Sequence, residues 1–431
     1  MLEVLQDGSR AAARQLERLA ARGESAAGIE PDVRKIIEAV RRGGDRALIR
    51  LTAKYDGVRL TRRCLFVTES EIDAAAREVP AATRRALERA HARLVRFHRK
   101  QVEHGFELRE DGVRTGMRIT PLAHVGVYVP GGTAAYPSSV LMNVVPARVA
   151  GVDEITVTTP PSTAGVRAEV LLAARIAGAT RVLRAGGAQA VAALAYGTES
   201  VARVDKIVGP GNVWVATAKR LVFGTVDIDM IAGPSEVLVV ADATANPRFV
   251  AADMLAQAEH DAQAAAICIT TSRRTAAGVV RALDQQLAEL GRRAVAKRSL
   301  QRYGTVLVVD SLARAIEVAN EIAPEHLELF VRGARRLLPM VRNAGAVFLG
   351  QYTTEPLGDY AAGPNHVLPT GGSARFSSPL GVYDFVKRTS IIEVTRRGFE
   401  RLAPTVERLA RSEGLEGHAL AVARRRADGG F

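Results

Sequence analysis

The stretch HVGVYVPG at residues 124–131 is a short apolar run that stops at a proline and a glycine. Three further runs of this kind follow it, at residues 154–158, 181–184 and 206–208. The segments between the runs have the apolar spacing of helices, at residues 139–150, 164–177 and 188–196. Short strands that alternate with helices through short links predict a parallel sheet with right-handed crossovers.

A second series of apolar runs predicts another α/β unit, with strands at residues 237–240, 265–270, 305–309 and 346–349. Amphipathic patterns predict further helices at residues 9–22, 31–53 and 80–104. The chain from about residue 381 is expected to be mainly helical. The expected architecture is therefore two α/β units with helical ends.

The composition of the 431-residue chain, 47% hydrophobic and 24% charged, excludes global disorder. Basic residues exceed acidic ones by 59 − 46 = 13, but they are spread along the chain, so we expect no nucleic-acid partner. Cys64 and Cys268 are too few for a disulfide framework, and Cys268 lies in an apolar run that predicts a buried, inert thiol. Without a secretory signal or a membrane-spanning run, a cytoplasmic location is expected.

Three glycine-rich turns follow strands of the first α/β unit, at residues 129–133, 185–189 and 208–212. Each turn leads into a helix, where free backbone N–H groups and the helix dipole can bind a phosphate. None has the GxGxxG spacing, and a tight turn without a ligand explains any single one of them equally well. Three such turns at the carboxyl edge of one parallel sheet favour a ligand site there.

Gln257 and His260 lie three residues apart at the C-terminal end of a predicted helix, so both are expected to project from one face there. That helix begins with Asn246 as N-cap and Pro247 as its first residue. An ordinary surface helix end is the alternative interpretation. The HExxH motif of zinc proteases is absent from the sequence.

Glu325 and His326 form a second candidate pair, directly after Pro324, which ends the preceding helix. The two residues are expected side by side at the start of a strand. An adjacent carboxylate and imidazole can serve two separate proton transfers, one of them on water. A solvated loop explains the pair equally well.

Two further clusters carry possible metal ligands. Asp359 and His366 lie in a loop rich in glycine and proline, and Glu413 and His418 lie near the C-terminus. Two histidines and an aspartate can hold zinc when a fourth ligand comes from elsewhere in the chain. A turn and a free helix end are the alternatives, and spacing alone does not show that the clusters converge.

Six motifs occur together in one order, at residues 126–132 (GVYVPGG), 209–212 (GPGN), 232–236 (AGPSE), 257–261 (QAEHD), 324–328 (PEHLE) and 363–370 (GPNHVLPT). In this order the chain resembles the histidinol dehydrogenases, from about residue 30 to His418. Each motif is weak alone, but six in register are specific. The resemblance implies two incomplete Rossmann-like α/β domains with small helical N- and C-terminal extensions.

The resemblance also implies a division of labour between the parts of the chain. Residues 121–235 would bind NAD, and residues 29–120 with 236–380 would carry most of the zinc and catalytic residues. Residues 1–28 would form the N-terminal extension, and residues 381–431 a helical dimerisation extension. The implied activity is the oxidation of L-histidinol to L-histidine in two NAD-dependent steps through an aldehyde, by a homodimer with one zinc ion per subunit.

The resemblance assigns individual residues by their match to the motifs. The implied zinc ligands are Gln257, His260, Asp359 and His418, the last expected to come from the partner subunit. Glu325 and His326 are the implied bases, and both also contact substrate. The ligand residues would contact substrate too, together with Ser235, His366 and Glu413. The implied NAD contacts are Tyr128, Gln189 and Asn212.

Three rival interpretations remain open for the sequence. A zinc hydrolase using His260 and Asp359 would work without NAD, and the three glycine turns argue against it. A binding protein with a retired site would be expected to lack Glu325 or His326, and both are present. A nucleic-acid binder driven by the net charge of +13 would form a specific complex at physiological salt.

Overall fold

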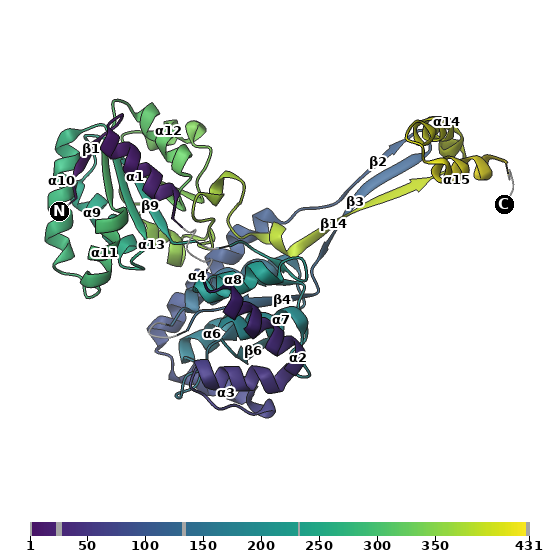
Figure 1. The fold of residues 1–431 in the computed structure, drawn as a ribbon, viewed down its shortest axis with the longest axis horizontal. Helices are drawn as coiled ribbons and strands as arrows, with labels where there is room; N and C mark the ends of the chain where they lie inside the picture. The colour runs from purple at the N-terminus through teal and green to yellow at the C-terminus, as the bar shows by residue number, and fades with distance from the viewer. Residues whose placement is uncertain (1, 23–27, 132–134, 232, 428–431) are drawn as a thin grey trace. The chain divides into compact units, whose positions relative to one another are not determined.

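The computed structural model describes residues 2–22, 28–131, 135–231 and 233–427 (Figure 1). The chain forms two compact units, one comprising residues up to 101 and 123–385, and the other comprising residues 102–122 and those from 386 onward. Residues 132–133 of the first glycine-rich turn and residue 232 of the AGPSE motif lie outside the described residues, as do residues 23–27 of the expected N-terminal extension. Within the described ranges, no helix is long and apolar enough to cross a membrane.

The first unit contains a five-stranded parallel sheet with the order β6 (Arg181–Arg184), β5 (Glu154–Thr159), β4 (His124–Tyr128), β7 (Lys206–Val208) and β8 (Asp227–Ile228). Numbered along the chain, these strands have the order 3-2-1-4-5, which is that of a Rossmann sheet without its sixth strand. The strand order reverses between β4 and β7, where such sheets bind ligands. The predicted strands of residues 121–235 are confirmed to within one residue at each end.

Helices link these strands where the sequence predicts them, namely α5 (Pro137–Ala150), α6 (Ala168–Ala177), α7 (Gly187–Tyr196) and α8 (Val213–Val222). Asn212 caps α8, since its side-chain oxygen accepts hydrogen bonds from the N–H groups of Trp214 (3.0 Å) and Val215 (3.2 Å). Gly151 and Gly178 end α5 and α6 in the left-handed conformation that glycine adopts readily.

Three helices from the N-terminal part of the chain cover this same sheet: α2 (Glu30–Tyr55), α3 (Glu69–Glu78) and α4 (Ala81–His98). They pack against α5, α6, α7 and α8. Val33, Val40 and Leu48 of α2 share one core with Leu194 of α7. The structure thus packs residues 30–98 mainly against the predicted NAD-binding domain, whereas they were expected with residues 236–380, which α4 also contacts at Gly358–Ala362. An amphipathic pattern predicts a buried face, but it does not identify the sheet that the face covers.

A six-stranded parallel sheet also lies in the first unit, with the order β1 (Val4–Gln6), β11 (Thr305–Val308), β10 (Ala265–Thr270), β9 (Glu236–Ala241), β12 (His326–Phe330) and β13 (Ala346–Leu349). Without β1, its strands again follow the order 3-2-1-4-5 along the chain. The expected fold class of two incomplete Rossmann-like sheets is therefore confirmed. Strand β1 differs from the expectation of a purely helical N-terminal extension, because it adds an edge to this sheet.

Helices cover both faces of the six-stranded sheet (Figure 1). One face packs against α9 (Pro247–Ala258), α10 (Arg273–Leu287) and α11 (Arg293–Tyr303), and the other packs against α1 (Arg10–Ala20) and α12 (Leu312–Ile322). Cys268 is fully buried in β10, where burial raises the pKa of its thiol to about 12. The prediction of a buried, inert thiol is confirmed.

The second unit is an antiparallel sheet of β14 (Val386–Val394), β3 (Val113–Pro121) and β2 (Phe106–Glu110), with α14 (Arg396–Ser412) and α15 (Glu416–Ala427). The segment from residue 381 is mainly helical as expected, but it also contains β14, which was not predicted and pairs with β3 over nine residues. Its side chains are exposed or half-buried along its whole length, so it lacks the alternation of a half-buried strand. Residues 102–122 also belong to this unit and not to an α/β domain.

Candidate active site

The candidate active site lies at the amino ends of β9 and β12, two neighbouring strands of the six-stranded sheet. His326, the first residue of β12, pairs in register with Val237, the second residue of β9. Helix α9 runs back from the far end of β9, so its last turn, which contains Gln257, returns to this edge. The C-terminal end of a helix carries partial negative charge and favours a cation nearby.

His326 is 3% exposed, and its two ring nitrogens have different surroundings. Its Nδ1 lies 3.1 Å from the backbone carbonyl oxygen of Glu236, to which the ring donates a hydrogen bond when Nδ1 carries the proton. Its Nε2 lies 3.6 Å from a carboxylate oxygen of Asp359 and has no hydrogen-bond partner within the described residues. In the neutral ring, the free electron pair is therefore on Nε2, where an incoming proton can be accepted.

Glu325 and Glu236 exchange hydrogen bonds across the two strands. The N–H of Glu236 donates to Oε2 of Glu325 (3.0 Å), and the N–H of Glu325 donates to Oε2 of Glu236 (3.3 Å). Oε2 of Glu325 also lies 3.8 Å from Nδ1 of His326. The prediction that Glu325 and His326 lie side by side at the start of a strand is confirmed.

Glu355 joins the site from α13 (Glu355–Leu357), a short turn after β13. The amide nitrogen of Gln257 donates to Oε1 of Glu355 (2.7 Å), and its oxygen accepts from the N–H of Glu236 (2.8 Å). Both side chains are almost fully buried. The Gln257 amide is thus held between a carboxylate and a backbone N–H.

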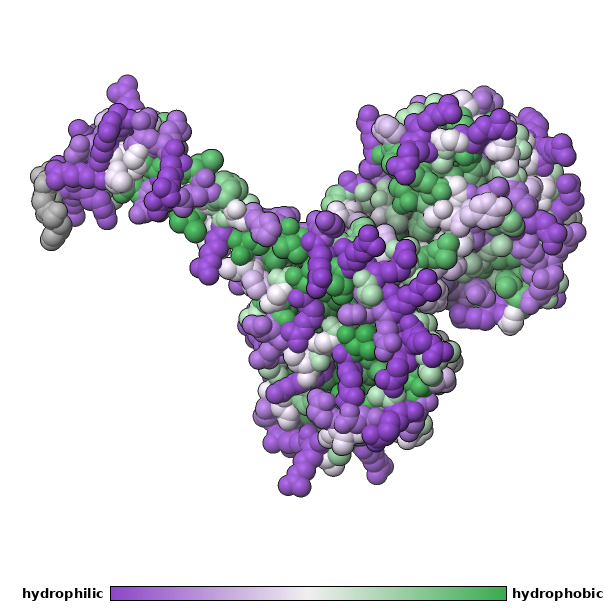
Figure 2. Space-filling model, turned by 180° about the vertical axis from the view of Figure 1, so that it is seen from behind, coloured by the Kyte–Doolittle hydropathy of each residue, from purple (hydrophilic) through white to green (hydrophobic). Residues whose placement is uncertain are grey.

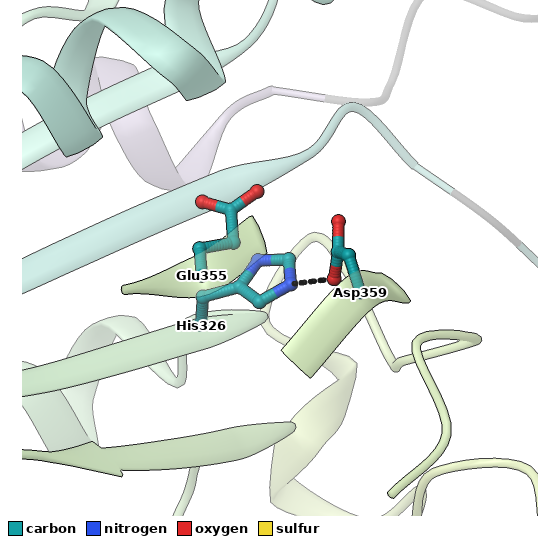
Figure 3. Close-up of side chains that lie close together, drawn as sticks. All are labelled: His326, Glu355 and Asp359. Atoms are coloured by element: carbon teal, nitrogen blue, oxygen red, sulfur yellow. Dashed lines mark ion pairs between the residues drawn. The ribbon is translucent and has the colours of Figure 1, made fainter. Parts of the chain in front are cut away.

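Three carboxylates surround the imidazole of His326. Figure 3 shows Asp359 facing one ring nitrogen and Glu355 lying beside the ring. Burial alone would lower the pKa of His326, but Glu355, Glu325 and Asp359 outweigh it and raise the pKa well above its usual value. Burial also raises the pKa of Glu325 to about 7 and that of Glu355 to about 8, with the charge of His326 opposing both shifts. So many acids in a dry pocket favour a cation, either a metal ion or an ammonium group.

A second layer of buried acids holds Glu355 in place. Its N–H donates to Oε1 of Glu328 (2.9 Å), and Thr354 donates from its hydroxyl to Asp253 (2.6 Å). Burial and the neighbouring acids raise the pKa of Glu328, and burial raises the pKa of Asp253. This layer fixes the turn that carries Glu355.

Asp359 lies in a π-helical segment, Gly358–Ala362, of the kind often found at functional sites. Burial would raise its pKa, but the interaction with the His326 ring, whose Nε2 lies 3.6 Å away, lowers it overall, so the carboxylate is ionised. Its backbone carbonyl oxygen lies 3.0 Å from Nδ1 of His366, a second predicted site residue. The structure therefore brings Asp359, His366 and His326 together from two distant segments.

Ser235 and His260 flank this group. Ser235 directly precedes Glu236 at the start of β9. His260 lies just past the end of α9 with an exposed side chain, and its N–H donates to the carbonyl oxygen of Gln257 (3.2 Å). Helix α9 ends at Ala258, so His260 is on the turn after the helix and not on its face.

Glu413 and His418, the remaining predicted residues, belong to the second unit. Glu413 ends α14, and His418 lies in the first turn of α15. Both side chains are exposed. The site in the first unit is therefore described from the predicted residues of that unit, without Glu413 and His418.

The donor set in the first unit fits a divalent ion. His326, Glu355 and Asp359 have ligand atoms within 4.8 Å of one another, and Gln257 contacts Glu355. Amide oxygen, imidazole and carboxylate are ligands that zinc accepts, and an ionised Asp359 is ready to bind a metal. Of the predicted ligands, Asp359 belongs to this cluster and Gln257 borders it through Glu355, which was not predicted.

A separate cleft lies at the carboxyl ends of the five-stranded sheet, with a volume of about 910 Å³. The predicted NAD contacts Tyr128, Gln189 and Asn212 all line it, as do Gly131 and Gly187 of two glycine turns. The hydroxyl of Tyr128 accepts from the N–H of Gly187 (3.1 Å), which has φ +60°. Gly187 therefore adopts a conformation that glycine favours, beside the first glycine turn.

Three residues of these two sites were missed by the sequence analysis: Asp56, Glu236 and Glu355. Asp56 lines the cleft and lies 3.4 Å from the amide nitrogen of Gln189. Glu236 follows Ser235 in a quoted motif, so its place beside a candidate residue was the only available signal. Glu355 stands next to Pro356 outside every motif, and no local pattern marks it.

Comparison with known proteins agrees with this geometry. The chain matches the family model of histidinol dehydrogenase over residues 19–426. It is 56% identical to the histidinol dehydrogenase of Aquifex aeolicus over 96% of each chain, and 52% identical to that of Syntrophotalea carbinolica over 95% of this chain and 96% of the relative. The crystal structure of histidinol dehydrogenase from Elizabethkingia anophelis matches with a TM-score of 0.93 at 36% identity, covering 99% of this chain and 98% of that one. The chain therefore belongs to the histidinol dehydrogenase family.

Proposed function

We propose that this protein oxidises L-histidinol to L-histidine in two successive NAD-dependent steps through histidinaldehyde. The observation that carries the proposal is the buried pair Glu325 and His326, which places two bases beside one another at the edge of a sheet. Family membership supports the substrate, and the acid-rich pocket suits its cationic amino group.

His326 would act as the base in the first oxidation. The neutral ring is favoured once a bound cation offsets the charge of the surrounding carboxylates, which otherwise raise its pKa. Its Nε2 then accepts the proton of the alcohol while a hydride leaves the same carbon for the nicotinamide ring. The hydrogen bond from Nδ1 to the carbonyl oxygen of Glu236 keeps the ring in the tautomer that this step needs. Asp359, next to Nε2, stabilises the imidazolium that results.

Glu325 would serve the second oxidation. Its carboxylate takes a proton from water, the resulting hydroxide adds to the aldehyde carbon, and the hydrate then loses a hydride to a second NAD. His326 again accepts the hydroxyl proton of the hydrate. With a pKa raised to about 7 by burial, Glu325 is basic enough for this role near neutral pH. Cys268 is buried and inert, so hydration replaces capture of the aldehyde by a thiol.

Zinc is proposed as the resident metal ion, one per subunit, held by Gln257, His260, Asp359 and the partner subunit's His418. When bound, the ion supplies a fixed anchor for the imidazole and amino nitrogens of the substrate. Glu355 would orient the Gln257 amide by accepting from its nitrogen, which leaves the amide oxygen as the ligand atom. Ser235, His366 and Glu413 would contact the substrate.

The NAD site is proposed in the cleft of the five-stranded sheet. Tyr128, Gln189 and Asn212 line it together with the glycine turns. The cleft lies at the carboxyl edge of a sheet with Rossmann strand order, where dinucleotides bind. Asn212 and Trp214, at the start of α8, line the cleft, so the N-terminal end of this helix borders it, where a phosphate is favoured.

A homodimer is proposed because the second unit exposes apolar side chains that a partner could cover. Phe106 and Leu108 of β2 and Ile392 of β14 are 54%, 61% and 73% exposed. Figure 2 shows apolar side chains gathered along the strands of this unit. A three-stranded sheet with so much apolar surface is expected to bury it against another chain.

The test is the stoichiometry of the reaction. Purified protein with zinc, NAD and L-histidinol should form two NADH per histidine, measured by NADH absorbance with the product identified by chromatography. One NADH with accumulating aldehyde would contradict the role of Glu325. No NADH with metal bound would exclude the proposed dehydrogenase activity.

A further inference from the structure

Glu236, the first residue of β9, contacts both proposed bases. Its carbonyl oxygen lies 3.1 Å from Nδ1 of His326, and its N–H donates to the carboxylate of Glu325 (3.0 Å). Its own carboxylate accepts from the N–H of Glu325 (3.3 Å). One residue therefore fixes the imidazole, the carboxylate and the backbone that joins them.

Glu236 is itself held by a buried cation from the N-terminal part of the chain. The guanidinium of Arg22, just past the end of α1, pairs with Oε1 of Glu236, and both side chains are at most 5% exposed. Arg22 also lies over the ring of Tyr303, 5.4 Å from its centroid, and Gly371 donates its N–H to the same carboxylate oxygen (3.2 Å). A carboxylate this deeply buried needs such partners to remain in place.

We propose that Glu236, clamped by Arg22, is a positioning residue that holds Glu325 and His326 in their working geometry. The inference rests on the proposed function, because it assigns a role toward those two bases. Neither Arg22 nor Glu236 is assigned to zinc, substrate or NAD. Arg22 holds the bases through its ion pair with Glu236, and its charge also acts directly on Glu325. Helix α1, which Arg22 follows, is therefore part of the support of the site.

The physical consequence is a loss of alignment when the clamp is removed. Without Arg22, the Glu236 side chain must shift, take up a proton or draw in water, and β9 moves at its first residue. The carbonyl oxygen that sets the tautomer of His326 moves with it. A displacement of about 1 Å in a catalytic base can lower the rate about 100-fold.

The main variants are Arg22→Met, which removes the charge but keeps the length, and Arg22→Lys, which restores a cation. We expect kcat for L-histidinol to fall about 10- to 100-fold in Arg22→Met, with KM values for histidinol and NAD within about threefold of wild type. Arg22→Lys should recover most of the lost kcat. Steady-state kinetics and the melting temperature are measured for each variant.

Arg22→Met leaves a buried carboxylate without its cation and could unfold the protein. The double variant Arg22→Met/Glu236→Gln removes both charges and should recover thermal stability. Its kcat should stay low, because one glutamine oxygen cannot replace two carboxylate oxygens that accept from the N–H groups of Glu325 and Gly371.

The matched control is the ion pair between Asp7 and Arg314, which ties the same N-terminal segment to α12 (2.8 Å). No contact joins that pair to Glu325 or His326 in the part of the chain that the structure describes. The control variant Asp7→Asn/Arg314→Met should keep kcat within about twofold of wild type.

Each outcome separates the inference from the proposed function. An inactive wild-type protein would overturn the proposed function. An active wild type whose folded double variant keeps kcat within about twofold would overturn the positioning role alone. The positioning role would also be overturned if Arg22→Met raised KM and left kcat unchanged. It would be overturned as well if kcat fell as far in the control variant Asp7→Asn/Arg314→Met as in Arg22→Met.

Discussion

The side-chain amide of Gln257 and the carboxylate of Glu355 are joined by a hydrogen bond of 2.7 Å at the buried end of α9. An amide can rotate to present either its oxygen or its nitrogen, and only the oxygen ligates a metal ion. Glu355 accepts from the nitrogen and so selects the orientation in which the oxygen is the available donor atom. Glu328 and Asp253 hold the turn of Glu355 from behind.

Replacement of Glu355 should therefore weaken zinc binding. In Glu355→Ala the Gln257 amide loses the acceptor that orients it, and we expect zinc affinity to fall about 10- to 100-fold, as for other residues that orient a metal ligand. Competition with a chromogenic chelator measures this directly. The control is Glu289→Gln, because Glu289 is exposed and belongs to the same unit. Unchanged zinc affinity in Glu355→Ala would show that Gln257 is oriented in another way.

Glu325 and His326 should separate the two oxidations. Glu325→Gln removes the base that activates water, so oxidation of histidinaldehyde should fall by about 100-fold or more while oxidation of histidinol is reduced much less. His326→Asn should impair both reactions, since the imidazole accepts a proton in each. Rates are measured separately with histidinol and histidinaldehyde. Equal losses in Glu325→Gln would contradict the division of labour, and intact turnover of either substrate in His326→Asn would exclude its role.

The sequence predicted the buried strands well, because a buried parallel strand is a short apolar run that glycine or proline ends. Strands β6, β10 and β13 have the predicted bounds. Strand β14 was missed since its sequence, VKRTSIIEV, mixes charged and apolar side chains and is exposed along most of its length. Its existence depends on pairing with β3, more than 250 residues earlier in the chain, which no local pattern records.

The site was predictable to the extent that its residues are neighbours in the sequence. Glu325 and His326 were found because they are adjacent. Glu236 and Glu355 could not be found in this way, because each is a single acid whose partner, Arg22 or Gln257, comes from a distant element. These acids matter to the site because they are buried against specific partners. The sequence around each acid does not show which side chains will contact it.

His418 provides a test of subunit sharing. If the partner subunit's His418 completes each zinc site, a His418→Ala protomer and a His326→Asn protomer can together form one intact site in a heterodimer. Mixing the two inactive variants should therefore restore a measurable fraction of wild-type activity after subunit exchange has been verified. Each variant mixed with itself is the control. No recovery would indicate that His418 serves the site of its own chain.

Asp56 should make folding stability depend on pH. Burial raises its pKa to about 6, although hydrogen bonds from Gly186 and Gln189 oppose the shift. Because the folded state binds this proton more tightly than the unfolded state, the contribution of Asp56 to stability falls as pH rises from about 4 through 6.

Asp56→Asn removes the charge, so it should raise the melting temperature relative to wild type by about 1–3 °C near pH 8, with a smaller difference near pH 4. Thermal melts across this pH range measure the difference, and Asp153→Asn, at an exposed position, is the control. A gain that is larger at low pH would mean that the Asp56 carboxylate is stabilised in the folded protein, and the sign of the argument would be reversed.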